Sequence, residues 1–301
     1  MLRSTCIAAA FAVLTLAPIH AANAAPALDT KSIESITGLE GSFDKTEQVF
    51  KLSKPRDDVK VVVDGWTLPS FMGTGSWAAF KSAGDGVMLM GDTVLFEDEV
   101  NAAMSAALKS GLEVTALHNH FFFDEPKVYF MHIAGMGDTE ELAKGVRAVY
   151  DAVDRVRAKE PKPQAAFGGQ IPAKSSITPG PIETLLGEKA QTKDGMAKIV
   201  IGRTAEMHGV TMGKAMGVNT WAAFAGSDEQ AVVDGDFAMH EDELQPVLKA
   251  MRAGGINIVA IHHHMTHEKP RYIFLHYWGK GPALELAKTV RAALDAQAAS
   301  K

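Results

Sequence analysis

Six histidines fall into two sets with the same spacing, and imidazole is the commonest metal ligand among protein side chains. One set lies in "ALHNHFFFDEPKVYFMHIAG" and the other in "AIHHHMTHEKPRYIFLHYWG"; the histidines are His118, His120, His132, His262, His264 and His276. Each set is a His-x-His pair followed by a third histidine. Residues two apart on a strand point to the same side, about 6.5–7 Å from each other. A strand through each pair would present both imidazoles on one face.

The third histidine is expected to join the pair through a β-hairpin. The segment Asp124–Pro126 predicts the turn, which would place His132 directly across from His118. Three imidazoles would then meet in a small volume, which suits Zn²⁺ or a similar divalent ion with its fourth position left open. The prediction depends on strand register, because a slip of one residue would turn His132 to the opposite face.

Carboxylates at the hairpin tips are the candidate catalytic residues. Asp124 and Glu268 occupy equivalent tip positions. Each is expected to be a metal ligand, a hydrogen-bond partner of a ligand, or the general base of a metal-dependent hydrolase. No residue is assigned to another cofactor, because the sequence has no Gly-rich phosphate loop, nucleophile elbow or cysteine-based metal motif.

Two alternatives remain open beside the metal-binding hypothesis, and whether the chain is an enzyme is not decided. In the first, the six histidines are structural and bond to carbonyls or carboxylates in a closed core. In the second, the chain is a non-catalytic binding module for a cell-envelope component or small metabolite. Its groove between the repeats would be lined by Trp77, Trp221, Phe122 and Trp278.

Other polar patterns are given structural interpretations. Glu97, Glu99, Glu241 and Glu243 are expected to favour helix N-termini. Asp92 and Asp236 each follow a glycine, which favours a role in a turn. The segment Glu206–Gly217 spaces three methionines around His208, a pattern that soft metals such as copper use, although methionine is more often core filler.

The chain is an internal tandem repeat. An offset of 144 residues superimposes the two histidine sets, the two "WAAF" segments, the two "ELAK" segments and the residues around them without a gap from Gly65 to Ala152. We expect a signal peptide at 1–24, a first repeat at 25–159, a linker at 160–181 and a second repeat at 182–301. The linker segment is rich in Pro, Gly and Ser.

Each repeat is predicted to be α+β, a mostly antiparallel sheet with packed helices, and the two repeats to be related by a pseudo-two-fold axis. Residues 100–109 carry an apolar stripe that ends at Gly111, and Asp138 is the expected N-cap of a closing helix. Val114 is expected on the histidine face of its strand and Leu117 on the other. Because both faces look apolar, helices should cover one and the sister repeat the other.

The N-terminus predicts export to the periplasm or the exterior. An apolar run too short to span a bilayer precedes the small-residue motif Ala22–Ala24, typical of a signal-peptidase site. Cys6, the one cysteine, lies in this segment, so the mature chain would have none. The net charge of −6 without a basic stretch argues against nucleic acid as a partner. We expect a small-molecule or cell-envelope ligand and no stable membrane insertion of the mature chain. The oligomeric state is undetermined.

These motifs resemble the LppY/LpqO family of bacterial exported proteins. The resemblance rests on the "HNH" or "HHH" strand, the acidic proline-containing tip and the following "FMHIAG" or "FLHYWG", and it extends over both repeats. It implies an exported, duplicated domain of unknown function, with no activity, substrate or catalytic residue attached. Lipoproteins of that family carry a lipidated cysteine, a feature from which this chain departs.

Overall fold

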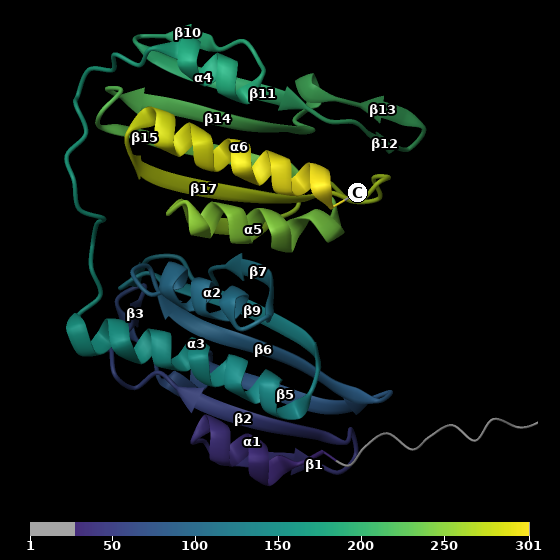
Figure 1. Ribbon diagram of the computed structural model, residues 1–301. Coiled ribbons are helices and arrows are strands. Elements are labelled where there is room, and N and C mark those ends of the chain that lie inside the picture. Colours follow the sequence, from purple (N-terminus) through teal and green to yellow (C-terminus); the bar gives the residue numbers. More distant parts are fainter. Residues whose placement is uncertain (1–27, 301) are drawn as a thin grey trace, which may run out of the picture.

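The computed structural model describes residues 28–300, which form a large antiparallel sheet with helices packed on one side (Figure 1). The predicted α+β class and the tandem arrangement are confirmed. The predicted signal peptide lies outside the described residues. Within residues 28–300, no helix is long and apolar enough to cross a membrane.

The first repeat contributes six strands to the large sheet and three helices to its cover. The strands are β1 (Gly41–Asp44), β2 (Val49–Pro55), β5 (Gly75–Ala83), β6 (Gly86–Phe96), β7 (Glu113–His118) and β9 (Val128–Gly137). The helices are α1 (Thr30–Thr37), α2 (Val100–Lys109) and α3 (Thr139–Lys159), with a 3-10 turn η1 (Ser70–Met72). A small separate sheet consists of β3 (Val62–Val63), β4 (Trp66–Thr67) and β8 (Asp124–Glu125).

The second repeat has the same plan. Its strands in the large sheet are β10 (Gln191–Lys193), β11 (Met196–Gly202), β14 (Asn219–Gly226), β15 (Ala231–Met239), β16 (Asn257–His262) and β17 (Ile273–Gly281). Its helices are α4 (Pro179–Leu186), α5 (Leu244–Ala253) and α6 (Ala283–Ala299), with 3-10 turns η2 (Lys214–Met216) and η3 (Glu241–Glu243). The hairpin β12 (Ala205–Met207) and β13 (Val210–Met212) stands apart from the sheet.

Local sequence signals explain where the helices begin and end. The Asp138 side chain accepts hydrogen bonds from the backbone N–H groups of Glu140 and Glu141, which confirms it as the N-cap of α3. Gly111 has a φ of 80° just after α2, a backbone conformation that glycine adopts without strain. The chain can therefore reverse there and enter β7.

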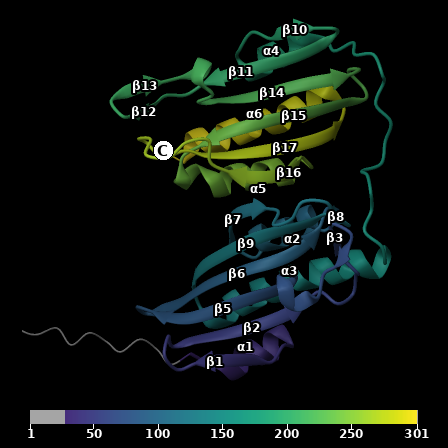
Figure 2. The ribbon, with the colours of Figure 1, turned by 180° about the vertical axis from the view of Figure 1, so that it is seen from behind.

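The two repeats join edge to edge into one continuous sheet. Strand β7 of the first repeat pairs antiparallel with β16 of the second, with Leu117 opposite Ile261. These residues are equivalent under the 144-residue offset. A pseudo-two-fold axis therefore passes between them, perpendicular to the sheet, and the same side of the sheet faces outward in both halves (Figure 2).

Reciprocal hydrogen bonds from two helix side chains support this junction. The Gln245 amide of α5 accepts from the Val114 N–H at 3.0 Å and donates to the Val114 carbonyl at 2.9 Å. The equivalent Asn101 of α2 accepts from the Ile258 N–H at 2.8 Å and donates to the Ile258 carbonyl at 3.4 Å. A helix side chain of each repeat thus forms the hydrogen bonds that backbone groups of the other repeat would form with a neighbouring strand in a regular sheet.

A β-bulge in each edge strand corrects one sequence prediction. The register between β7 and β9 shifts between Val114 and Ala116, and the same shift occurs between Ile258 and Ala260 in β16. The extra residue lets Val114 and Leu117 both enter the core under the helices. The prediction that Val114 lies on the histidine face was wrong, because simple alternation does not anticipate a bulge.

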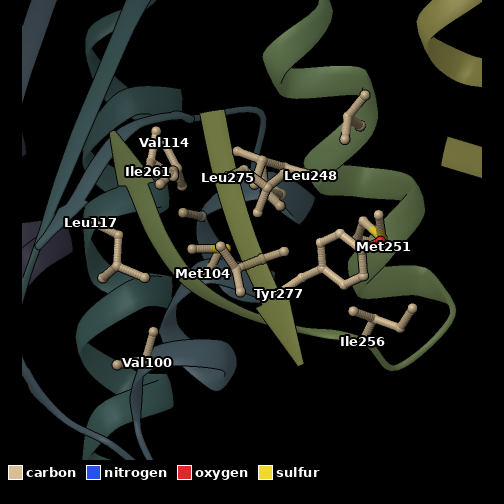
Figure 3. Packing of buried hydrophobic residues seen from close by; sticks show 14 of the residues in the cluster. Val100, Met104, Val114, Leu117, Leu248, Met251, Ile256, Ile261, Leu275 and Tyr277 are labelled. Atoms are coloured by element: carbon tan, nitrogen blue, oxygen red, sulfur yellow. The ribbon is translucent and has the colours of Figure 1, made fainter. Parts of the chain in front are cut away.

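The main core lies between the sheet and the helices and crosses the junction. Met104 and Leu117 of the first repeat and Leu248 and Ile261 of the second belong to one buried cluster (Figure 3). In the part of the chain that the structure describes, the opposite face of the sheet carries no helix (Figure 2). The prediction that the sister repeat covers that face was wrong, because the repeats extend the sheet instead of stacking on it.

Only the end of the helix-free face in each repeat is covered. In the first repeat Val61 packs on Val94, Phe96 and Phe130, and in the second Ala205 and Met212 take part in a small cluster around Phe274. Elsewhere on the helix-free face side chains are exposed, as are Met88 and Met90 of β6 and Met136 of β9, at 41%, 51% and 65%. This arrangement leaves the middle of the sheet accessible from one side.

A buried ion-pair network anchors the entry of α2. Glu99, whose side chain is 0% exposed, pairs with the Arg56 guanidinium at 2.7 Å and with Arg157 Nε at 2.7 Å, and it accepts from the Phe96 N–H at 2.9 Å. Glu243 has the equivalent place in the second repeat and binds Arg203. These glutamates lie at helix N-termini as predicted, but they also hold buried arginines.

Glu99→Ala should destabilise the protein by about 3–5 kcal/mol, because it leaves two buried guanidinium groups without their shared carboxylate. Chemical denaturation monitored by circular dichroism measures this loss. The matched control is Asp154→Ala, which removes the more exposed pair between Lys54 and Asp154 and should cost at most about 1 kcal/mol. Equal losses in the two variants would contradict the described burial of Glu99.

Candidate metal centre

The histidines of the second repeat gather around a buried aspartate on the helix-free face. Asp236 lies within β15 directly opposite His276 of β17, and His276 in turn lies opposite Ala260 of β16. His262 ends β16 and pairs with Phe274. Since residues two apart share a face, His262 and His276 project to the same side as Asp236.

Three of these groups are close enough to bind one ion together. His264 Nε2 lies 3.0 Å from Asp236 Oδ2 and 3.1 Å from His262 Nε2. One donor atom each from Asp236, His262 and His264 lie within 4.8 Å of one another. The His276 ring stacks on His262, with centroids 4.7 Å apart, and its Nδ1 lies 3.2 Å from the Gly235 carbonyl oxygen. His276 is thus a neighbour that could turn toward an ion held by the other three.

The first repeat repeats the constellation with different contacts. Asp92 of β6 lies opposite His132 of β9, and His118 Nε2 lies 3.1 Å from His132 Nε2. The rings of His118 and His120 are stacked with centroids 5.1 Å apart. The closest nitrogen contact thus joins a different pair of histidines than in the second repeat.

The register differs by two residues from the predicted one. His118 pairs with Phe130, and His132 pairs with Ala116, so His132 lies diagonally from His118 instead of directly across. A shift of two residues keeps the face, which is why the three histidines still come together. His120 and His264 follow the ends of their strands, and their rings lie flat on Phe130 and Phe274 with centroids 3.4 and 3.5 Å apart.

The aspartates are the site residues that sequence reasoning misplaced. Asp92 and Asp236 are 8% and 2% exposed and lie inside β6 and β15, so the predicted turn role was wrong. The preceding glycine makes room for the core instead: a Cβ on Gly235 would lie 2.2 Å from the Tyr277 ring. The signal was present in the sequence, since an aspartate recurs at the 144-residue offset within two apolar strand segments.

Burial disfavours the charged forms of both the aspartates and the histidines of the clusters. It raises the pKa of Asp236 and of Asp92, although the neighbouring histidines lower each of them. Burial, together with the charges of the adjacent His276 and His264, lowers the pKa of His262 to about 4. The pKa of His120 is lowered mainly by burial as well. Imidazoles that remain neutral near pH 7 are in the protonation state that metal binding requires.

The two tip carboxylates lie away from these contacts. Asp124 Oδ2 accepts from the Val128 N–H at 2.7 Å, and Glu268 Oε1 accepts from the Tyr272 N–H at 3.1 Å. Both side chains are buried, and their hydrogen bonds stabilise the hairpin tips. The peptide bonds before Pro126 and Pro270 at these tips are cis. Among the described contacts of residues 28–300 none joins either carboxylate to a histidine of the cluster, and the general-base role stays a prediction.

The remaining histidines of the second hairpin lie outside the cluster. His263 points away from it, and its Nδ1 lies 3.0 Å from the Tyr272 carbonyl oxygen. His267 stands at the tip, with its ring 6.2 Å from that of His208. In the methionine-bearing segment, Met212 is buried in a small core whereas Met216 is 63% exposed, so the structure does not bring its methionines together around His208.

The aromatic residues proposed for a groove are dispersed. Trp77 and Trp221 lie on the helix-free face under the ammonium groups of Lys51 and Lys198, at 4.6 and 4.0 Å from the ring centroids. Phe122 is 82% exposed at the first hairpin. Trp278 alone of the four lines a cavity described for residues 28–300.

Comparison with known families confirms the duplication. The family described as Domain of Unknown Function (DUF1259) matches residues 31–152 and again residues 180–296. The chain belongs to this family. Its two DUF1259 domains correspond to the two halves of the sheet, each with one Asp–His cluster.

Other comparisons give no functional guide to this DUF1259 protein. No curated protein matches it. A crystal structure of the trimeric bacterial microcompartment shell protein PduB is similar at 12% identity over 85% of this chain and 89% of that chain, with a TM-score of 0.20. EtuB from Clostridium kluyveri is similar at 10% identity over 86% of this chain and 91% of that chain, with a TM-score of 0.19.

The stacking of histidine on phenylalanine makes a spectroscopic prediction. Ring currents of Phe130 and Phe274 should move the carbon-bound ring protons of His120 and His264 to lower chemical shift than those of His267. Phe274→Leu should return the His264 resonances toward ordinary values and leave those of His120 in place, while Phe130→Leu should do the reverse. Proton–carbon correlation spectra measure these chemical shifts. His264 resonances that stay unchanged in Phe274→Leu would contradict the stacked geometry.

Proposed function

We propose that this protein binds a divalent metal ion through Asp236, His262 and His264, with His276 completing the set. The supporting observation is the convergence of three donor atoms within 4.8 Å of one another on the helix-free face. Oxygen and nitrogen donors of this kind suit Zn²⁺ and related ions. The equivalent set Asp92, His118, His120 and His132 is proposed as a second site.

Unsatisfied polar atoms favour a ligand at both sites. Asp236 Oδ1, Asp92 Oδ1 and His262 Nδ1 are buried and have no hydrogen-bond partner among residues 28–300. A buried polar atom without a partner costs about 1–3 kcal/mol. A bound cation would neutralise the aspartate that burial disfavours as an anion, and it would use neutral imidazoles that burial already favours.

The proposed chemistry is hydrolysis at a site exposed on one side of the sheet. A bound Zn²⁺ would lower the pKa of a coordinated water toward 7. His264 is partly exposed, with 32% of its side chain accessible, so a ligand can approach from the helix-free face. Asp236 would be a ligand of the ion, and the general-base role of Asp124 and Glu268 stays a prediction.

Metal content tests the proposal. Protein prepared without chelator should contain up to two divalent ions per chain by elemental analysis. His262→Ala with His264→Ala should remove one of them, and adding His118→Ala with His120→Ala should remove the other. Asp236→Asn should weaken metal binding at the site formed by Asp236, His262 and His264 by about 10–100-fold, because it removes the anionic partner of the imidazoles.

The matched control removes the same number of histidines as the first double variant but leaves both clusters intact. His208→Ala with His267→Ala removes two nearby histidines outside both sets and should not change the metal content. A variant with all six cluster histidines replaced by alanine that retains the metal content of the parent would contradict the proposal.

We also propose that the chain is exported and is a member of the LppY/LpqO group within its family. The support is the apolar N-terminal run with the Ala22–Ala24 motif, and the hairpin motifs already described. Expression in a bacterial host with an intact secretion system should yield a periplasmic or secreted protein. Intact-mass measurement should give a chain that begins at Ala25, and a cell-associated chain that retains residues 1–24 would contradict export.

A further inference from the structure

A cavity of about 240 Å³ lies where the two repeats and the linker meet. Its walls come from the start of α2, from the beginning of β16, from Tyr129 and Trp278, and from linker residues 164–167. Hydrogen bonds at both ends of this linker segment hold it over the cavity. The Gln164 N–H donates to Asp98 Oδ2 at 3.1 Å, and Lys280 Nζ donates to the Phe167 carbonyl at 3.1 Å.

The walls combine aromatic side chains with the carboxylates of Glu97 and Asp98. Tyr129, Phe167 and Trp278 are each only partly covered by protein. Glu97 lies at the same cavity and forms no ion pair with a cation in the described part of the chain, whereas Asp98 is paired with Arg157. Partial burial raises the pKa of Glu97, the nearby Lys127 lowers it, and the carboxylates of Asp124 and Asp98 raise it. A cationic ligand would offset the repulsion from Asp124 and Asp98.

The sister repeat lacks these features, which makes it an internal reference. Under the 144-residue offset, Tyr129 corresponds to Ile273 and Trp278 corresponds to Ala134. Glu97 corresponds to Glu241, so the carboxylate is kept while two aromatic walls are lost. The aromatic walls therefore belong to one side of the pseudo-two-fold axis and are not required by the shared fold.

We propose that this cavity binds a small organic ammonium ion, held by the aromatic faces of Trp278, Tyr129 and Phe167 and by the Glu97 carboxylate. Aromatic rings attract alkylammonium groups through their negative faces, and a nearby carboxylate adds charge complementarity. This site goes beyond the proposed metal centres. Trp278 lies two residues beyond His276 on the same face of β17.

Calorimetric titration of the full chain with choline, and separately with its uncharged isostere 3,3-dimethyl-1-butanol, tests this proposal. Choline should bind with one-to-one stoichiometry, and the isostere at least tenfold more weakly. Glu97→Gln should weaken choline binding about tenfold or more. Trp278→Ala, which installs the residue of the sister repeat, should weaken it by a similar factor.

Two controls separate the cavity from general surface effects. Glu241→Gln removes the equivalent carboxylate and Trp221→Ala removes an aromatic residue on the helix-free face, and neither should change choline binding. Thermal unfolding of each variant identifies any that fail to fold. Glu97→Gln changes a side chain at the surface, so comparing its choline affinity with that of the parent protein is the decisive measurement. Absence of choline binding, equal binding of the uncharged isostere, or choline binding unaffected by Glu97→Gln would overturn the proposal.

Discussion

The structure depends on the burial of one face of the sheet beneath the helices. Most side chains on that face are apolar or small, as the buried Leu117 and Ile261 illustrate, and the buried Tyr277 donates its hydroxyl to the Trp221 carbonyl. Side chains one position away along each strand must then point to the opposite face. Asp92, Asp236 and the third histidine of each set occupy such positions, so packing of the core fixes where the polar groups converge.

Pairing of β7 with β16 gives both clusters a common side. Because the two-fold axis is perpendicular to the sheet, the histidine sets open toward the same half-space, unlike in a stacked dimer of sheets. The two copies have also diverged. In the second, His264 reaches Asp236, whereas in the first His118 reaches His132, and the cavity walls at Tyr129 and Trp278 have no aromatic counterparts in the sister positions.

Much of this arrangement could be predicted from the sequence because it follows from local rules. The duplication, the N-cap at Asp138 and the shared face of the histidines needed only an offset, a capping preference and strand alternation. The bulge beside Val114 and the strand location of Asp236 could not be read locally. The first depends on how two edge strands meet, and the second on Tyr277, which is distant in sequence and occupies the space above Gly235. The open face was missed because apolar content does not reveal which surface a partner covers.

Anomalous diffraction from crystals grown with Zn²⁺, with data collected on both sides of the zinc absorption edge, tests whether the two clusters bind an ion. We expect a peak on the helix-free face between Asp236, His262 and His264, with a second peak between Asp92 and the histidines of the first repeat. Clear density for these side chains without a zinc peak between them, each imidazole bonded to protein groups alone, would contradict this expectation.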